Sequence, residues 1–265
     1  MTLSLCCFTC GSDTTVPALL NDTPERVKEE DSAAYFHNLL HAINEVQELH
    51  ELVRGGDRQF KSILQQLDFG AYFINEYVAT EVGVQMQLKY LVQDSTVLYA
   101  LVTSIDSFYR SRMTDLMLHH NEQGLQQYAN QHQQFYGKAY SAEQLITELF
   151  TAPLSIQIAC GNGTFAYGDT ERQVFKAVRD RDLAYINELL RSVAPERQAL
   201  GVIALQKLME AGYELPESSI KLKNHLLERN SRVSACVSCS YGGTYELQDY
   251  LSRYRWELIP NIDLD

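Results

Sequence analysis

The sequence predicts an α+β fold that is predominantly helical, and three observations support this prediction. Apolar residues recur at helical spacing through most of the chain, whereas residues 82–90 alternate between apolar and polar side chains. Hydrophobic residues make up 45% of the 265 residues and charged residues 21%, which is a globular rather than a disordered composition. We therefore expect helices with a small antiparallel β-meander, followed by a helical module.

The chain is predicted to have three parts. Residues 1–31 form a flexible N-terminal segment or tether, because residues 12–31 are polar and contain Pro17 and Pro24. Residues 32–150 combine helices with a small antiparallel sheet. Residues 151–265 form a helical module that ends in a turn with a Cys-x-x-Cys motif.

Helical periodicity in the first 150 residues predicts five helices. The first is long and amphipathic, and Gly55 and Gly56 end it. Asp57 is placed to cap the second helix. The predicted helices cover residues 32–54, 58–67, 108–119, 122–136 and 142–150.

A change of period predicts the meander. Val82, Val84, Met86, Leu88 and Tyr90 alternate with polar residues or glycine, which is typical of a half-buried strand. A turn at residues 93–95 leads into an antiparallel partner over residues 96–103, and residues 71–78 supply a third strand.

The second half of the chain is predicted to contain short amphipathic helices. They cover residues 171–179, 183–192, 196–211 and 217–230. Pro195 and Pro216 stand near first helical turns, and Gly212 is placed to end the third helix. The segment PERQALGVIALQKL at 195–208 resembles a HEAT-type helix, and AVRDRDLAYINELL at 177–190 resembles an ankyrin- or HEAT-type hairpin. This resemblance implies stacked helical hairpins, which usually bind other proteins.

The net charge of −12 bears on the class of partner. Phosphate contacts need clustered Lys and Arg, so bulk binding of nucleic acid is excluded. Residues 22–51 carry −6 and residues 171–232 carry +2, so a basic protein partner is expected at the N-terminal side, unless the acidity serves only solubility. No apolar run reaches the roughly 18–20 residues of a transmembrane span.

The first ten residues resemble the end of a bacterial lipoprotein signal. They are uncharged and largely apolar, and they precede a polar tether, so the resemblance implies a lipid anchor on Cys10 and a place in the bacterial cell envelope. The basic n-region of such signals is absent and the apolar run is short, which leaves the cytoplasm as the alternative.

Four cysteines form two Cys-x-x-Cys motifs, Cys7 with Cys10 and Cys236 with Cys239. Two residues between thiolates allow a turn that directs both sulfurs at one metal, so the four could bind zinc if the termini meet. A redox disulfide between Cys236 and Cys239 is the second interpretation. Small semi-buried thiols beside a turn at residues 241–243 are the third.

A glycine-rich turn follows Ile156 and Ile158. Gly161, Gly163 and Ala166 match the pattern G-x-G-x-x-G/A and resemble the first motif of S-adenosylmethionine-dependent methyltransferases. The resemblance implies a cofactor-binding turn between a strand and a helix. Gln157 stands where that family usually has an acid, and few candidate strands follow; a plain turn is the alternative.

The histidines give a weaker pattern. His37, His41 and Glu45 share one face of the predicted first helix, a spacing suited to a metal, but the apolar stripe places them toward water. His119, His120 and His132 are interpreted as solvated or helix-end residues.

The sequence therefore favours a non-catalytic protein-interaction or structural protein. The helical hairpins and the acidic first helix support this class, and no nucleophile elbow, zincin motif, P-loop or kinase signature occurs. The alternative is a methyltransferase-like enzyme that uses the turn from Gly161 to Ala166. An uninterrupted run of helices after Gly168 would count against the enzyme.

Overall fold

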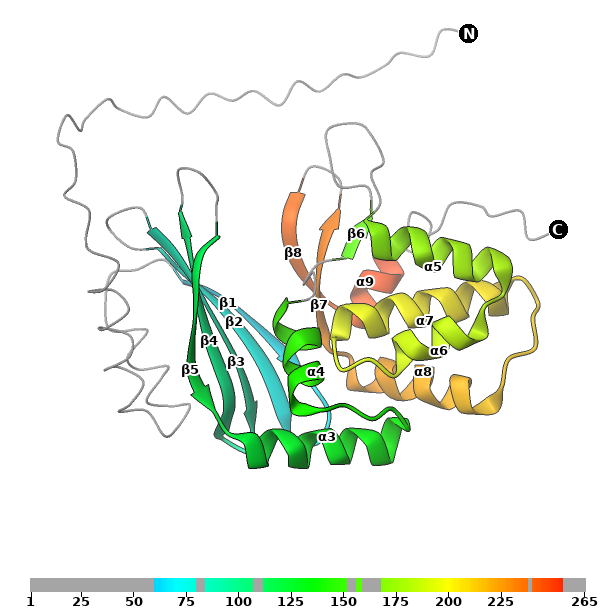
Figure 1. Ribbon diagram of the computed structural model, residues 1–265. Coiled ribbons are helices and arrows are strands. Elements are labelled where there is room, and N and C mark those ends of the chain that lie inside the picture. The colour runs from blue at the N-terminus through cyan, green and yellow to red at the C-terminus, as the bar shows by residue number, and fades with distance from the viewer. Residues whose placement is uncertain are drawn as a thin grey trace, which may run out of the picture.

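The computed structural model describes residues 60–79, 84–106, 112–151, 156–158, 168–237 and 240–254. Figure 1 shows an antiparallel sheet on one side of the molecule and a helical unit with a small second sheet on the other. The α+β class is therefore confirmed.

The first sheet is a five-stranded meander in which each strand pairs antiparallel with the next. Its strands are β1 (Phe60–Gln66), β2 (Ala71–Ala79), β3 (Val84–Gln93), β4 (Thr96–Asp106) and β5 (Arg112–His120). The three strands that the alternating pattern predicts are β2, β3 and β4, and all three are confirmed. The turn predicted at residues 93–95 joins β3 to β4, where Asp94 and Ser95 have φ angles of 48° and 69°.

Two segments predicted as helices are strands. The predicted helix over residues 58–67 is β1 from Phe60 onward, and the predicted helix over residues 108–119 is β5 from Arg112 onward. Both are the outer strands of the meander, and each pairs with a single neighbour among the described strands. The apolar residues of both segments are spaced in a way that fits a helix as well as a strand. Backbone hydrogen bonds to β2 and β4 favour the strands, and these long-range contacts cannot be read from a local sequence pattern.

Two helices and a π-helical turn follow the meander and cover one of its faces. They are α3 (Glu122–Tyr136), α4 (Ala142–Ile146) and the π-helical segment η1 (Thr147–Thr151). Asn121 caps α3 through its side chain, which accepts from the Gly124 amide at 2.9 Å, and Ser141 and Gln144 form a capping box on α4. Both helices lie where the periodicity predicts them.

The helical unit contains four consecutive helices. They are α5 (Asp169–Asp180), α6 (Leu183–Leu190), α7 (Pro195–Glu210) and α8 (Glu217–Arg229), in agreement with the four predicted segments. Helix α7 is the central one, because most of its residues are buried. Gly212 has a φ of 81° directly after α7, which is the helix end that the sequence predicts.

A second sheet and a last helix complete the described chain. The sheet has the order β6 (Ile156–Ile158), β7 (Arg232–Val237) and β8 (Ser240–Glu246), and α9 (Leu247–Tyr254) follows it. Strand β6 runs parallel to β7, and all four helices lie between them in the chain. Strands β7 and β8 and helix α9 are not among the predicted elements, because their segments are short and the Cys-x-x-Cys motif at the junction of β7 and β8 indicates a turn.

Two hydrophobic cores hold the structure together. One joins the meander to α3, α4 and η1, and the other joins α5–α8 to the second sheet and α9. Tyr136 of α3 belongs to the helical core, and Val193, between α6 and α7, belongs to the meander core. Each unit therefore contributes a side chain to the core of the other, across the predicted boundary near residue 150.

Candidate functional site

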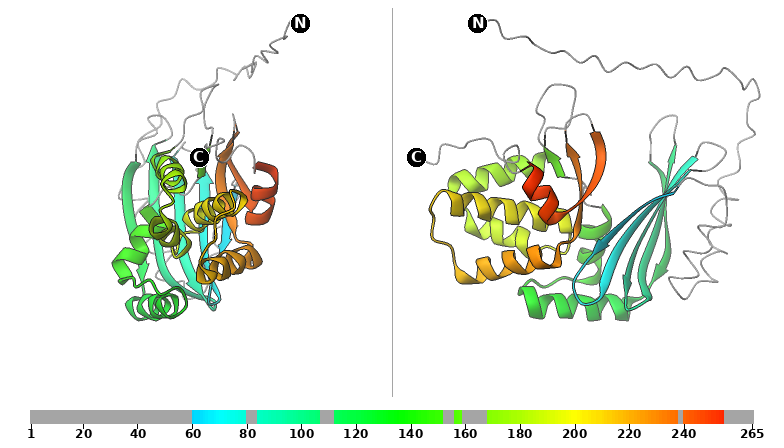
Figure 2. Two further views of the ribbon diagram at one scale, coloured as in Figure 1. Left: turned by 90° about the vertical axis from the view of Figure 1, so that its right-hand side faces the viewer. Right: turned by 180° about the vertical axis from the view of Figure 1, so that it is seen from behind.

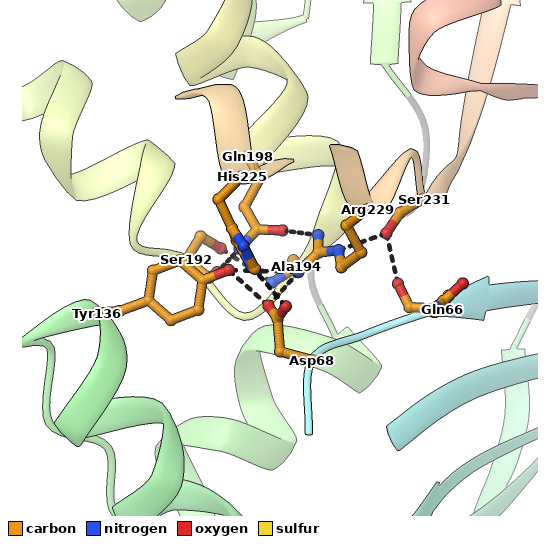
Figure 3. A network of polar contacts seen from close by, with 9 residues as sticks. All are labelled: Gln66, Asp68, Tyr136, Ser192, Ala194, Gln198, His225, Arg229 and Ser231. Atoms are coloured by element: carbon orange, nitrogen blue, oxygen red, sulfur yellow. Dashed lines mark hydrogen bonds and ion pairs between the residues drawn. The ribbon is translucent and has the colours of Figure 1, made fainter. Parts of the chain in front are cut away.

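A buried carboxylate, Asp68, lies where the meander meets the helical unit. It occupies the turn between β1 and β2, and Figure 3 shows donors converging on it from α3 and α8. The Tyr136 hydroxyl donates to Asp68 Oδ2 at 2.5 Å, and His225 Nε2 lies 2.8 Å from Oδ1. Arg229, one helical turn after His225, pairs with Oδ2. We call these four residues the Asp68 centre.

The electrostatics of the Asp68 centre keep its carboxylate charged. Burial acts to raise the pKa of Asp68, but the Arg229 guanidinium and the hydrogen bonds of Tyr136 and His225 outweigh it and hold the pKa below its ordinary value of 3.8. Burial raises the pKa of Tyr136, so its phenol stays a neutral donor. The Asp68 and Arg229 side chains are 10% and 7% exposed, so this ion pair lies largely out of water.

Arg229 extends the Asp68 centre into three further elements. Its Nη2 donates to Gln198 Oε1 of α7 at 2.5 Å, and its Nε donates to Ser231 Oγ at 2.7 Å. Ser231 Oγ in turn donates to the Gln66 carbonyl of β1 at 2.5 Å. A single guanidinium thus fixes α7 and the start of β7 relative to the end of β1 (Figure 3).

The polar contacts continue from Gln198 to Glu148 on the π-helical segment. Gln198 Nε2 donates to the Ser192 carbonyl at 2.6 Å, and Ser192 Oγ donates to Glu148. Glu148 also lies 3.7 Å from Lys138 Nζ and 3.5 Å from an Arg197 guanidinium nitrogen. A chain of side chains therefore links the Asp68 centre to Glu148.

A pocket of about 580 Å³ opens at the Glu148 end. Lys138, Tyr140, Glu148 and Arg197 are among the residues that line it. The two cations face the one largely buried acid, and Lys138 also pairs with Glu188 at 3.2 Å. Glu143 also lines the pocket, so the two cations of its lining are matched by two acids, Glu143 and Glu148.

A second buried acid, Glu196, lies in the first turn of α7. Its Oε1 accepts from Gln65 Nε2 of β1 at 2.6 Å and from the Ser234 amide of β7 at 3.0 Å. Its Oε2 makes no hydrogen bond of good geometry with the described residues. Glu196 is 3% exposed, and this burial raises the pKa of its carboxyl. Glu196 is thus a second polar tie between the meander and the helical unit.

The Asp68–His225 pair could in principle orient a general base. A nucleophile would then have to lie within hydrogen-bond reach of the histidine. Among the described residues, His225 is hydrogen-bonded only to Asp68, and its ring packs 4.6 Å from that of Phe135. The described part of the chain therefore provides His225 with an acid but with no nucleophile.

The residues that the sequence singles out as cofactor, metal and lipid sites lie almost entirely outside the described residues. This holds for Gly161, Gly163 and Ala166, and for Cys7, Cys10 and Cys239. Cys236 is described only in its backbone, within β7 and opposite Gln157 of β6. The set of His37, His41 and Glu45 also lies outside.

Three other histidines are described. His119 and His120 are exposed at the end of β5, as predicted, and His120 Nε2 lies 2.7 Å from Glu122 Oε2. The prediction is wrong for His132, which is 1% exposed and stacks on Tyr136 at 4.5 Å. Burial lowers the pKa of His132, which favours its neutral form. In the described chain, no three His, Cys, Asp or Glu side chains are grouped to bind a metal.

Sequence reasoning did not find the Asp68 centre. Asp68 is 157 residues from His225 and 161 from Arg229 in the chain, and no motif links them. The only local signal is the spacing of His225 and Arg229, which places them on one face of a helix.

The arrangement after Gly168 bears on the resemblance to methyltransferases. Residues 169–229 contain four helices in succession, and the first strand after them is β7. The alternation of strands and helices that the resemblance implies is absent from this described stretch. No helix in the described ranges is long and apolar enough to cross a membrane. Comparison with models of protein families, with curated proteins and with solved structures gave no match.

Proposed function

We propose that this chain is a non-catalytic protein-interaction protein whose meander and helical unit form one rigid platform. The proposal rests on the contacts of the Asp68 carboxylate, which are all made within the chain. Its carboxylate is largely buried, and Tyr136, His225 and Arg229 of the same chain occupy both of its oxygens. A carboxylate saturated in this way stabilises an interface and is not available to a substrate.

The helical unit is the proposed binding module. We expect α5–α8 to act as HEAT-like hairpins, because α7 packs against α5, α6 and α8 while their outer faces stay exposed. The acidic residues 22–51 are the proposed attraction for a basic partner, and a lipid anchor on Cys10 would hold the platform at a membrane of the cell envelope.

Affinity purification after mild cross-linking, with quantitative mass spectrometry, tests the interaction. The full chain is compared with a variant carrying Glu45→Gln, Glu48→Gln and Glu51→Gln. We expect a basic partner to be recovered with the native chain, and several-fold less of it with the variant, because the electrostatic attraction is lost.

The matched control removes three exposed acids of the helical unit, with Glu214→Gln, Glu217→Gln and Glu228→Gln. It has the same net charge as the first variant and should retain the partner. Equal recovery with all three proteins would show that the acidity serves only solubility. A thermal-shift titration with S-adenosylmethionine covers the enzymatic alternative, since saturable stabilisation would replace the present proposal.

A further inference from the structure

The meander has a second apolar face, opposite the one that packs on α3 and α4. Strand alternation places Ile74, Tyr90 and Ala100 side by side on this face, because Ile74 pairs with Tyr90 and Tyr90 with Ala100. Leu88 and Val102 form the neighbouring pair on the same face. The opposite side chains, such as Phe73 and Leu91, belong to the core with α3 and α4.

This second face is buried, although no described element covers it. Ile74, Leu88, Tyr90, Ala100 and Val102 are at most 6% exposed, yet none of them belongs to either core of the described residues. Figures 1 and 2 show α4 and the helical unit on the other side of the sheet. An occupant for this face therefore has to be sought in the sequence outside the described ranges.

The chain before β1 is the segment that fits. The stretches outside the described ranges that lie between elements have at most nine residues each, and residues 255–265 follow α9, which adjoins the second sheet. Residues 32–54 combine a seven-residue apolar stripe with a predicted helix, and only residues 55–59 separate them from the outer strand β1. A helix of this length spans about 34 Å. The ten residues of β3 span about 33 Å.

We propose that residues 32–54 form an amphipathic helix that docks its apolar stripe on this second face. Leu40 and Ile43 lie in the stripe, whereas Glu45 and Glu48 fall on the opposite side of the predicted helix. Docking turns the meander into the middle layer of three and presents the acidic side chains outward on a fixed surface. The inference goes beyond the proposed function, since it holds whether or not that surface has a partner.

Photo-cross-linking in the full chain tests the docking. p-Benzoylphenylalanine replaces Tyr72, which lies on the second face next to Val92 and is 37% exposed. After irradiation we expect intramolecular cross-links to peptides from residues 32–54. The same probe at Phe135, which is 48% exposed on α3, is the control and should give none of these peptides. Cross-links from position 72 to another segment, or to a second copy of the chain, would overturn the proposal.

Cysteine accessibility gives a second test. Val102→Cys, at the centre of the face, should react slowly with a maleimide, as followed at that peptide by mass spectrometry. Adding Leu40→Glu and Ile43→Glu should speed the reaction about tenfold or more, because the cover opens locally. Adding Glu45→Gln and Glu48→Gln, on the far side of the predicted helix, should leave the rate unchanged. Fast labelling at position 102 without the stripe substitutions, or no acceleration with them, contradicts the docking. If the stripe variant does not fold, the cross-links in the otherwise native chain decide.

Discussion

Two buried acids at the junction of the sheet and the helices have opposite electrostatic environments. Asp68 faces Arg229 and keeps its charge, whereas Glu196 accepts two neutral donors, Gln65 and Ser234. Burial disfavours the charged form of both, but only Asp68 has a cation beside it. The two acids should therefore contribute to stability at opposite ends of the pH scale.

Asp68→Asn should cost about 3 kcal/mol of unfolding free energy at neutral pH, because it leaves Arg229 buried without its counter-ion. The pKa of Asp68 is lowered, so its stabilisation is present above the ordinary value of 3.8 and disappears as the pH falls through the lowered value. Urea unfolding from pH 7 to pH 2 should show the two curves converging in acid. Asp180→Asn, at an exposed acid of α5, is the control and should change stability by less than about 0.5 kcal/mol. A constant difference between wild type and Asp68→Asn across this range would contradict the assignment.

Glu196→Gln should show the opposite pH dependence. The pKa of Glu196 is raised, so the folded state favours its neutral form, and stability falls as the pH rises from the ordinary value of 4.5 through the raised one. Glutamine stays neutral, so the variant should gain stability relative to the wild type between pH 4 and pH 8. The same unfolding experiment checks this, and parallel curves would show that Glu196 is charged in the fold.

At the scale of elements, the sequence predicts what local periodicity determines. The four helices of the helical unit and strands β2, β3 and β4 lie where the patterns place them. The predictions for the segments of β1 and β5 are wrong because their apolar residues fit a helix as well as a strand. Pairing with β2 and β4 in the sheet determines that both segments are strands. The Asp68 centre could not be predicted, because its partners meet only after the helical unit has folded against the meander.

The contact between α6 and α7 allows a test of packing at this scale. A Cβ added at Gly201 of α7 would lie 2.9 Å from the Leu190 amide nitrogen and 3.1 Å from Leu189 Cβ on α6. Alanine would raise helix propensity by about 1 kcal/mol. The clash with a packed backbone should outweigh this gain, for a net loss of about 1–3 kcal/mol.

Thermal and urea unfolding of Gly201→Ala measure the balance. Gly124→Ala in α3 is the comparison, because its added Cβ meets only side-chain atoms, a terminal methyl group of Leu98 at 2.7 Å and the Asn121 side chain at 3.1 Å. Side-chain ends can shift more readily than the α6 backbone, so Gly124→Ala should cost less than Gly201→Ala. A stabilised Gly201→Ala protein would show that α6 and α7 are free to separate.

For the whole molecule, the two units depend on one another through polar ties and shared side chains. Tyr136 belongs to the helical core and also donates to Asp68, while Gln65 reaches Glu196 from β1. These contacts support a single platform rather than two independent domains. Among these contacts, the Asp68–Arg229 pair couples the meander to the helical unit.

A double-mutant cycle measures this coupling most directly. The unfolding free energies of the wild type, Asp68→Asn, Arg229→Met and the double variant are compared at pH 7 and low salt. We predict that each single variant loses about 3 kcal/mol or more, and that the double variant loses about 1–3 kcal/mol less than the sum, because neither partner is then left unpaired. Losses that add within about 0.5 kcal/mol would contradict the claim, since independent sites behave in that way.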